Sequence, residues 1–400
     1  MQNWENVYAA RTDRIKSSAI RELLKLSQQP DVISFAGGLP AAEVFPVDLI
    51  KKAVNVVLET NSDVALQYGT TEGYTPLRKV IKKSNEKYNI NFDIDNIMIT
   101  AGGQQALDLI GKVFINPGDK VLVEAPTYLG ALQAWNTYGA EYVCIPNDEH
   151  GMMVDQLEKL LSSDIKLIYA LPNFQNPTGV TLSFERRKIL IELAEKYNVP
   201  IIEDDPYGRL RYEGEHLPPL YSISGQNNNE YNGNVIYMSS FSKILSPGFR
   251  LAWMIAPKDV ISKLVQAKQG TDLHTGTFSQ VVAYEVCKDD FLNEHIKNVC
   301  RVYNDRRNVM LDTLCEHMPD RVSWSHPEGG LFLWVKLPDE MDTEAIFPAA
   351  VDEKVAYVPG SAFFADGSGH NAMRLNFSYA QPEQINEGIN RLSKVIKKYI

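Results

Sequence analysis

From about residue 95 the chain alternates short β-branched runs with helical patterns. The run "NIMIT" precedes the helical "QQALDLIGKVF", "KVLVE" precedes "YLGALQAWNTYG", and "KLIYALP" precedes "FERRKILIELAEKYN". Further runs of this kind are "EYVCIP", "VPIIED" and "NVIYMSS". Strands that alternate with helices predict an α/β fold with a mostly parallel sheet between helices. In such sheets ligands bind beyond the carboxyl ends of the strands, so we expect the chemistry just after each run.

The alternation stops near residue 285. There a long helical stretch leads into the strand-like runs "LFLWVKLP", "VAYVPGSAFF" and "AMRLNFSYA", which predict a smaller α+β unit. A chain of 400 residues is long enough for two packed units. We therefore expect an N-terminal arm over residues 1–45 that joins the small unit, a large unit over 46–284 and a small unit over 285–400.

Composition excludes several classes of protein. The net charge of −10 argues against a basic face for nucleic acid. The four cysteines show no CxxC spacing, which favours reduced thiols in a cytoplasmic protein, and the seven histidines form no metal-binding pair. No apolar run approaches the roughly 18–20 residues of a membrane span. The N-terminus also lacks the apolar core of a signal peptide.

Two strand ends offer places for an anion and a flat ring. "AGGQQ" follows the first run and opens a helix at Gly103 and Gln104, where free backbone N–H groups favour an anion. A simple tight turn is the alternative, and neither GxGxxG nor a Walker lysine is present. Tyr128 follows "KVLVEAP", and it is either a core residue or a side chain that stacks on a ring.

The next two strand ends carry an amide and a carboxylate. Asn176 lies in "NFQNPTG", where an asparagine often caps its own turn. Asp204 ends a buried run and is followed three residues later by Tyr207. A buried carboxylate is costly without a cationic partner, and a protonated ring nitrogen would serve as one.

The last run leads into "SSFSKILSPGFR", which holds Ser240, Ser242, Lys243 and Arg250. Taken alone, Lys243 is either a solvated lysine or a reactive group. Five strand ends together supply an anion cradle, an aromatic ring, a carboxylate, hydroxyls and a lysine at one edge of the sheet. These groups match the needs of pyridoxal 5′-phosphate, which binds a lysine through its aldehyde and requires partners for its ring nitrogen and phosphate.

The same motifs resemble those of the fold-type I aminotransferases. "NPTG", "DDPY", "SFSKILSPGFR" and Arg374 in "MRLNFS" occur in the order and spacing of that family over essentially the whole chain. "SFAGGLPAAEVFP", "LQYGTTEGYTPLR" and "PNFQNPTG" are similar to the 2-aminoadipate aminotransferases, a branch that includes the mammalian kynurenine/aminoadipate aminotransferase. The resemblance implies a seven-stranded, mostly parallel sheet in the large unit and a pyridoxal-phosphate-dependent aminotransferase.

The resemblance also implies roles at the cofactor. Lys243 would form the Schiff base and move a proton between the substrate Cα and the cofactor. Asp204 would hold the ring nitrogen, and Asn176 and Tyr207 the phenolic oxygen. The remaining cofactor contacts would come from Tyr128 on the ring face and from Gly103, Gln104, Ser240, Ser242 and Arg250 on the phosphate. Relatives often carry a serine at the position of Gly103, so the cradle here lacks one hydroxyl.

On the substrate side the family pattern implies that Arg374 clamps the α-carboxylate beside Asn176 and the turn at Gly38. Arg21 matches a position that meets the distal end of a substrate, although a helix-surface arginine is an equal alternative. Tyr68 resembles a tyrosine that reaches the phosphate of a neighbouring subunit, which implies a homodimer with shared sites. We expect amino transfer to 2-oxoglutarate from 2-aminoadipate, aromatic or branched-chain amino acids.

Two alternatives remain open at this stage, and two others are disfavoured. The first is an aminotransferase restricted to aromatic amino acids, and the second is a pyridoxal-phosphate lyase or decarboxylase with the same site. A transcriptional regulator with this fold would need a DNA-binding domain ahead of it, for which we expect no room before residue 34. A scaffold without activity should lack Lys243 or Asp204, and this chain has both.

Overall fold

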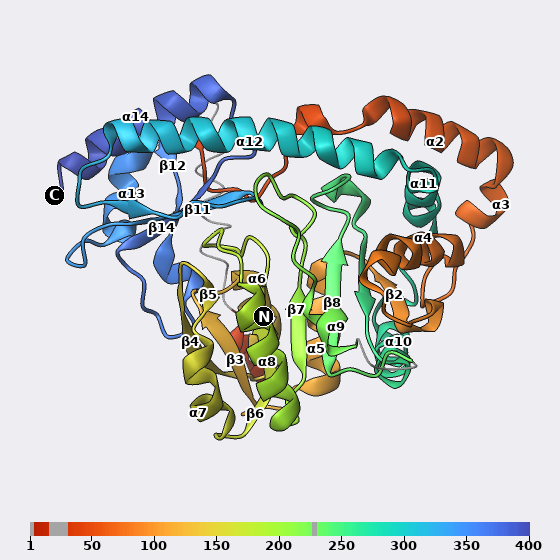
Figure 1. The fold of residues 1–400 in the computed structure, drawn as a ribbon. Helices are drawn as coiled ribbons and strands as arrows, with labels where there is room; N and C mark the ends of the chain where they lie inside the picture. Colours follow the sequence, from red (N-terminus) through yellow and green to blue (C-terminus); the bar gives the residue numbers. More distant parts are fainter. Residues whose placement is uncertain (1–3, 16–30, 226–229) are drawn as a thin grey trace.

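The computed structural model describes residues 4–15, 31–225 and 230–400, and Figure 1 shows their arrangement. Its centre is an eight-stranded sheet with the strand order β2-β9-β8-β7-β6-β3-β4-β5. The strands are β2 (Ile97–Thr100), β3 (Lys120–Ala125), β4 (Glu141–Asp148), β5 (Gly151–Met152), β6 (Ile165–Ala170), β7 (Ile201–Asp204), β8 (Val235–Ser240) and β9 (Ala252–Ile255).

The strands from β8 across to β4 pair in parallel, and β9 is antiparallel to both of its neighbours. The expected seven strands are therefore present, together with β5, a two-residue strand that pairs antiparallel to β4 at the edge. All the runs expected before residue 285 are strands of this sheet, so the α/β fold is confirmed. Strand β9 was not expected, because its short "AWMI" run directly follows the Pro-Gly turn and has no helix before it.

Alternating side chains divide the sheet into two packed faces. Val121 and Val123 of β3 belong to one buried cluster, whereas Leu122 between them belongs to the other, as the two-residue period of a strand requires. Residues of α5, α6 and α10 pack on the first face. Residues of α4, α8, α9 and α11 pack on the second, in a cluster that continues into the C-terminal part of the chain.

The helices of the described chain vary from one turn to seven. Their bounds are α2 (Val47–Thr60), α3 (Ser62–Ala65), α4 (Thr75–Asn85), α5 (Gly103–Phe114), α6 (Leu129–Asn136), α7 (Leu157–Leu161), α8 (Phe184–Lys196), α9 (Leu220–Ser224), α10 (Lys258–Asp272), α11 (Thr277–Cys287), α12 (Phe291–His317), α13 (Thr343–Asp352) and α14 (Pro382–Lys397). None of the helices in the described ranges is both long and apolar enough to span a bilayer.

The C-terminal part contains a second, four-stranded antiparallel sheet, and α12 runs above it from α11 to α14 (Figure 1). Its strands, in order, are β10 (Ser323–Trp324), β11 (Phe332–Lys336), β14 (Ala372–Asn376) and β13 (Val358–Pro359). Near the N-terminus, β1 (Ile33–Ser34) pairs in parallel with β12 (Val355–Ala356), so the chain before α2 joins this part. The boundaries at residues 45 and 284 stay predictions.

Candidate active site

One cavity of about 400 Å³ lies at the carboxyl ends of β7 and β8, next to the second sheet. It gathers most of the residues singled out from the sequence. These are Gly38, Gly103, Gln104, Tyr128, Asn176, Asp204, Tyr207, Ser240, Ser242, Lys243, Arg250 and Arg374. Tyr68 does not line it: its side chain is 78% exposed, and its ring meets the ring of His274 edge-on. Arg21 lies outside the described residues.

Lys243 is half-buried just after β8, and its Nζ donates a hydrogen bond to the carbonyl oxygen of Gly38 at 2.7 Å. Burial, together with the positive charges of Arg374 and Arg250, lowers the pKa of Lys243 to about 8. An amine with a lowered pKa is more often unprotonated near neutral pH, which is the form that attacks a carbonyl carbon.

Asp204 ends β7 and is only 6% exposed. The hydroxyl of Tyr169 on β6 donates to its Oδ2 at 2.7 Å, and within the described chain no cation pairs with it. Burial raises the pKa of Asp204 to about 7, and the neighbouring Asp205 adds to the shift. A protonated ring nitrogen in the cavity would supply the missing positive charge.

Replacing Asp204 with asparagine should therefore stabilise the cofactor-free protein at alkaline pH. The pKa of the Asp204 carboxyl is 3.8 in an unperturbed chain and about 7 in the folded protein. Between about pH 4 and pH 7 the folded protein therefore holds a proton that the unfolded chain has lost. The wild-type unfolding free energy then falls as pH rises through this window, and asparagine removes that loss. In urea unfolding, the gain should be large near pH 8 and small near pH 4.

The exposed Asp320→Asn is a matched control, since its burial changes little on folding. Equal gains for Asp204→Asn at both pH values would contradict the buried-charge explanation. In the cofactor-loaded protein, Asp204→Asn should instead lower the free energy of unfolding, because asparagine cannot neutralise a protonated ring nitrogen.

An anion cradle is formed where α5 begins. Gly102 precedes the helix with φ of 88°, and a Cβ there would collide with Nη2 of Arg250, so the guanidinium lies against the backbone. Across the cavity, Oγ of Ser240 lies 2.9 Å from Oγ of Ser242. Helix N–H groups, two hydroxyls and a guanidinium are the donors that a phosphate requires.

Gly102 was missed by the sequence analysis, which assigned the cradle to Gly103. A Cβ on Gly103 would meet Cε of Met238 at 3.5 Å, an ordinary contact, so the fold does not require glycine there. The position that requires glycine is the preceding one, Gly102, because of its positive φ and the guanidinium that lies against it. The side-chain amide of Gln104 is directed to the carbonyl of Gly130 at 2.9 Å, which leaves its backbone facing the cradle.

Arg374 on β14 lies at the other end of the cavity. Its Nη1 donates to Oδ1 of Asn176 at 2.8 Å and its Nη2 to the carbonyl of Ala36 at 2.7 Å, whereas its buried Nε has no partner in the described chain. The guanidinium carbon lies 4.2 Å from the ring centroid of Phe332 and 4.9 Å from that of Phe363. A buried guanidinium without a carboxylate partner is suited to a ligand carboxylate.

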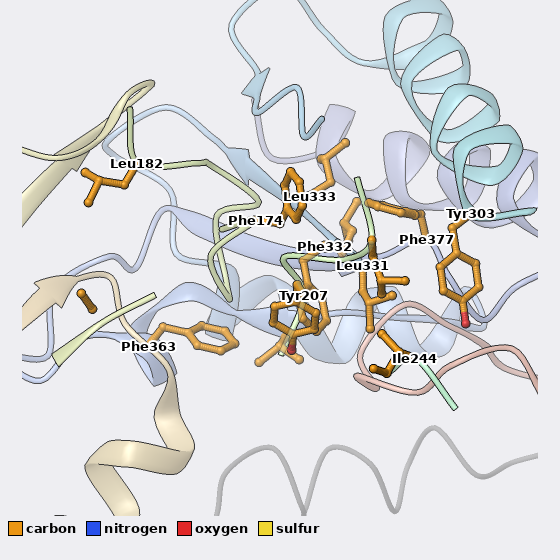
Figure 2. Close-up of a cluster of buried hydrophobic side chains, with 14 of the residues drawn as sticks. Phe174, Leu182, Tyr207, Ile244, Tyr303, Leu331, Phe332, Leu333, Phe363 and Phe377 are labelled. Carbon is orange, nitrogen blue, oxygen red and sulfur yellow. The ribbon is translucent and has the colours of Figure 1, made fainter. Parts of the chain in front are cut away.

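Aromatic side chains form the remaining walls. Figure 2 shows Tyr207 beside Phe332, and their rings meet edge-on with centroids 5.8 Å apart. Tyr128 directly precedes α6 and packs over Gly130, where a Cβ would lie 2.5 Å from its ring. Phe332 and Phe363 were not expected at the site, because the "GGLFLW" and "GSAFF" runs are typical of ordinary core strands.

A lysine, a buried carboxylate, an anion cradle and an unpaired guanidinium at one end of an α/β sheet define a fold-type I pyridoxal-phosphate enzyme. The residues present fit that cofactor, since Asp204 would hold its ring nitrogen and the cradle with Arg250 would hold its phosphate. A family model described as aminotransferase class I and II matches residues 30–392. The chain therefore belongs to the class I and II aminotransferases, and it is a pyridoxal 5′-phosphate-dependent aminotransferase.

Several relatives cover the whole chain. Aromatic-amino-acid aminotransferase 1 of Thermococcus litoralis is 49% identical over 99% of this chain and 95% of its own. The crystal structure of a multiple substrate aminotransferase from Thermococcus profundus has a TM-score of 0.94 at 48% identity and covers 99% of both chains. An α-aminoadipate aminotransferase from Thermus thermophilus, complexed with N-(5′-phosphopyridoxyl)-L-leucine, has a TM-score of 0.92 at 40% identity, with 99% coverage of both.

Proposed function

We propose that the protein transfers amino groups from a broad range of amino acids to 2-oxoglutarate by ping-pong chemistry. The donors we propose are 2-aminoadipate and aromatic and branched-chain amino acids. The observation that carries this proposal is the buried Arg374, which has no carboxylate partner in the described chain and lies between two phenylalanine rings. The guanidinium suits the α-carboxylate common to all donors, and the rings suit apolar side chains. The printed names of the relatives, which include aromatic, aminoadipate and multiple-substrate enzymes, support this range.

Bound pyridoxal 5′-phosphate supplies an electron sink that makes the Cα proton of an amino acid labile. Lys243 would hold the cofactor covalently and, once released by the substrate, accept and return that proton. Asp204, fixed by Tyr169, would keep the ring nitrogen protonated. Asn176 and Tyr207 would donate to the phenolic oxygen.

Further residues would hold the two ends of the cofactor and the substrate. Tyr128 would lie on the ring face. The phosphate contacts we propose are Gly103, Gln104, Ser240, Ser242 and Arg250, with Gly102 providing the close approach. Arg374 would bind the substrate carboxylate, with Asn176 and the backbone of Gly38 beside it, and Arg21 would meet the distal end of the substrate.

We further propose a cytoplasmic homodimer with shared sites. The support is Tyr68, whose side chain is largely exposed in a single chain, and Leu66 beside it, which is 71% exposed. An apolar, aromatic surface of this kind is typical of a subunit interface. Sedimentation equilibrium should give twice the chain mass, and a single-chain mass would remove this part of the proposal.

A donor panel tests the proposed function. The purified, cofactor-loaded enzyme should lose its visible absorbance band on addition of an amino donor and regain it with 2-oxoglutarate. We expect turnover of aminoadipate, leucine and phenylalanine, with kcat/KM values for leucine and phenylalanine within about a hundredfold of each other, because small changes in an apolar side chain alter the transition-state free energy by only ~1–3 kcal/mol. Strong preference for alanine or aspartate would contradict the proposed range. Turnover of aromatic donors alone would favour the aromatic-specific alternative, and release of many equivalents of product per site without 2-oxoglutarate would favour a lyase.

A further inference from the structure

A second cavity of about 410 Å³ lies on the other side of the β7 and β8 strand ends. Asp204 lines the first cavity and the next residue, Asp205, lines the second, as expected for neighbouring side chains at a strand end. Ser239 borders both cavities, whereas Lys243 and Arg374 border only the first. The volume lies within the roughly 300–1,000 Å³ range of small-molecule sites.

Two cations in this second cavity lack a carboxylate partner. The guanidinium of Arg209 donates to the neutral side chain of Asn293, and no ion pair involves Arg209 or Lys87 in the ranges that the structure covers. Desolvation lowers the pKa of Lys87 and the positive charge of Arg209 lowers it as well, whereas the negative charge of Asp205 raises it. Burial also lowers the pKa of Arg209, which is half-buried, while Lys87 is exposed. Two cations that repel each other favour an anion bound between them.

The carboxylates that border the cavity are engaged elsewhere. Oδ1 of Asp205 accepts the backbone N–H of Gly208 at 2.8 Å, and Asn173 and Tyr237 donate to the same carboxylate. Asp290 accepts from the side chain of Asn293. Neither Asp205 nor Asp290 forms an ion pair with Arg209 or Lys87, although the charge of Asp205 acts on Lys87, so both cations retain donors for a ligand anion.

The rest of the wall is aromatic. Tyr88, Tyr237, Phe241 and Trp253 border the cavity, and the rings of Phe241 and Trp253 lie with centroids 4.8 Å apart. Flat apolar walls beside a pair of cations suit a small molecule that has both a ring and a negative charge. An inorganic anion would leave these walls without a partner.

We propose that this cavity is a second ligand site, separate from the transamination site, that binds a small aromatic carboxylate. The carboxylate would lie between Arg209 and Lys87, and the ring would lie among the aromatic side chains. The site requires neither Lys243 nor Arg374, so it goes beyond the proposed amino transfer.

Equilibrium dialysis of 4-hydroxybenzoate against the cofactor-loaded enzyme tests the proposal. The Arg374→Gln enzyme, which lacks the main carboxylate ligand of the first cavity, should still bind the probe at one site per chain. Adding Arg209→Gln or, separately, Lys87→Gln should weaken that binding about tenfold or more, the effect of one lost charge-assisted hydrogen bond. An excess of inorganic phosphate should not displace the probe.

Lys288→Gln is the matched control, because Lys288 borders the same cavity but is paired with Glu285. It should leave the affinity unchanged within about twofold. The proposal is overturned if the Arg374→Gln enzyme binds no probe, if Lys288→Gln weakens binding as much as Arg209→Gln, or if phosphate competes equally. Near-identical thermal unfolding curves for the variants will show that the fold is intact, and the two independent cation variants keep the test decisive if one of them fails to fold.

Discussion

Replacement of Lys243 by alanine is expected to lower kcat/KM about 10⁴- to 10⁶-fold for every donor, as is typical when a covalent nucleophile is removed. Among the described residues that line the cavity none can substitute for it, since the other basic groups there are the guanidinium groups of Arg250 and Arg374, which stay protonated. Steady-state assays with phenylalanine and 2-oxoglutarate measure the loss.

A second readout separates a chemical role for Lys243 from a structural one. Borohydride reduction should attach the cofactor covalently to wild-type protein at the peptide that holds Lys243, and the alanine variant should show no such mass increase. Its phosphate cradle is intact, so it should still retain cofactor on gel filtration. Lys258→Ala is a suitable control, because this exposed lysine pairs with Asp93 and Glu230 far from the cavity. Covalent attachment in the Lys243→Ala variant would disprove the assignment.

Replacement of Arg374 by alanine is expected to lower kcat/KM roughly 10²- to 10³-fold for all donors alike. Loss of one partner of a buried, hydrogen-bonded charge pair costs about 2–5 kcal/mol, and the α-carboxylate is the anion that all donors share. The change also frees Asn176, whose Oδ1 accepts from Nη1 of Arg374, so part of the loss will appear in kcat.

The substrate panel makes the Arg374 prediction specific. If the loss were confined to 2-aminoadipate and glutamate, Arg374 would bind the distal carboxylate instead, and the α-carboxylate would need another partner. Arg321→Ala is the control, since Arg321 is an exposed arginine that pairs with Glu340 in the same C-terminal part. It should leave kcat/KM within about twofold for every donor.

Much of the cavity could be predicted from local sequence because parallel strands share one direction. Asp204 and Lys243 each follow a buried run, and parallel pairing of β7 with β8 brings the carboxyl ends of those runs together. The same logic placed Tyr128 and Asn176 nearby. The chemical roles of these residues stay predictions, which the variants above test.

Other features depended on contacts that no local pattern encodes. Tyr169 reads as a core residue of β6, and only the packing of β6 beside β7 aims its hydroxyl at Asp204. Gly102 is distinguished from Gly103 only by its positive φ and by the guanidinium packed on it. Tyr68 and Arg21 stay predictions: the first points away from the cavity of its own chain, and the second lies outside the described residues.

The sequence by itself determined the α/β class, the strand ends that carry chemistry and the family, because these depend on residues close together in the chain. Tertiary structure alone decided how the two ends of the chain complete the site. Arg374 meets Asn176 across 198 residues and Ala36 across 338, and Lys243 meets Gly38 across 205. Such contacts form only when the C-terminal sheet packs on the large one, since burial of the shared core offsets the entropy of closing those long loops. Tertiary structure also brings Arg209 and Lys87 to the border of a second cavity, which no motif in the sequence predicts.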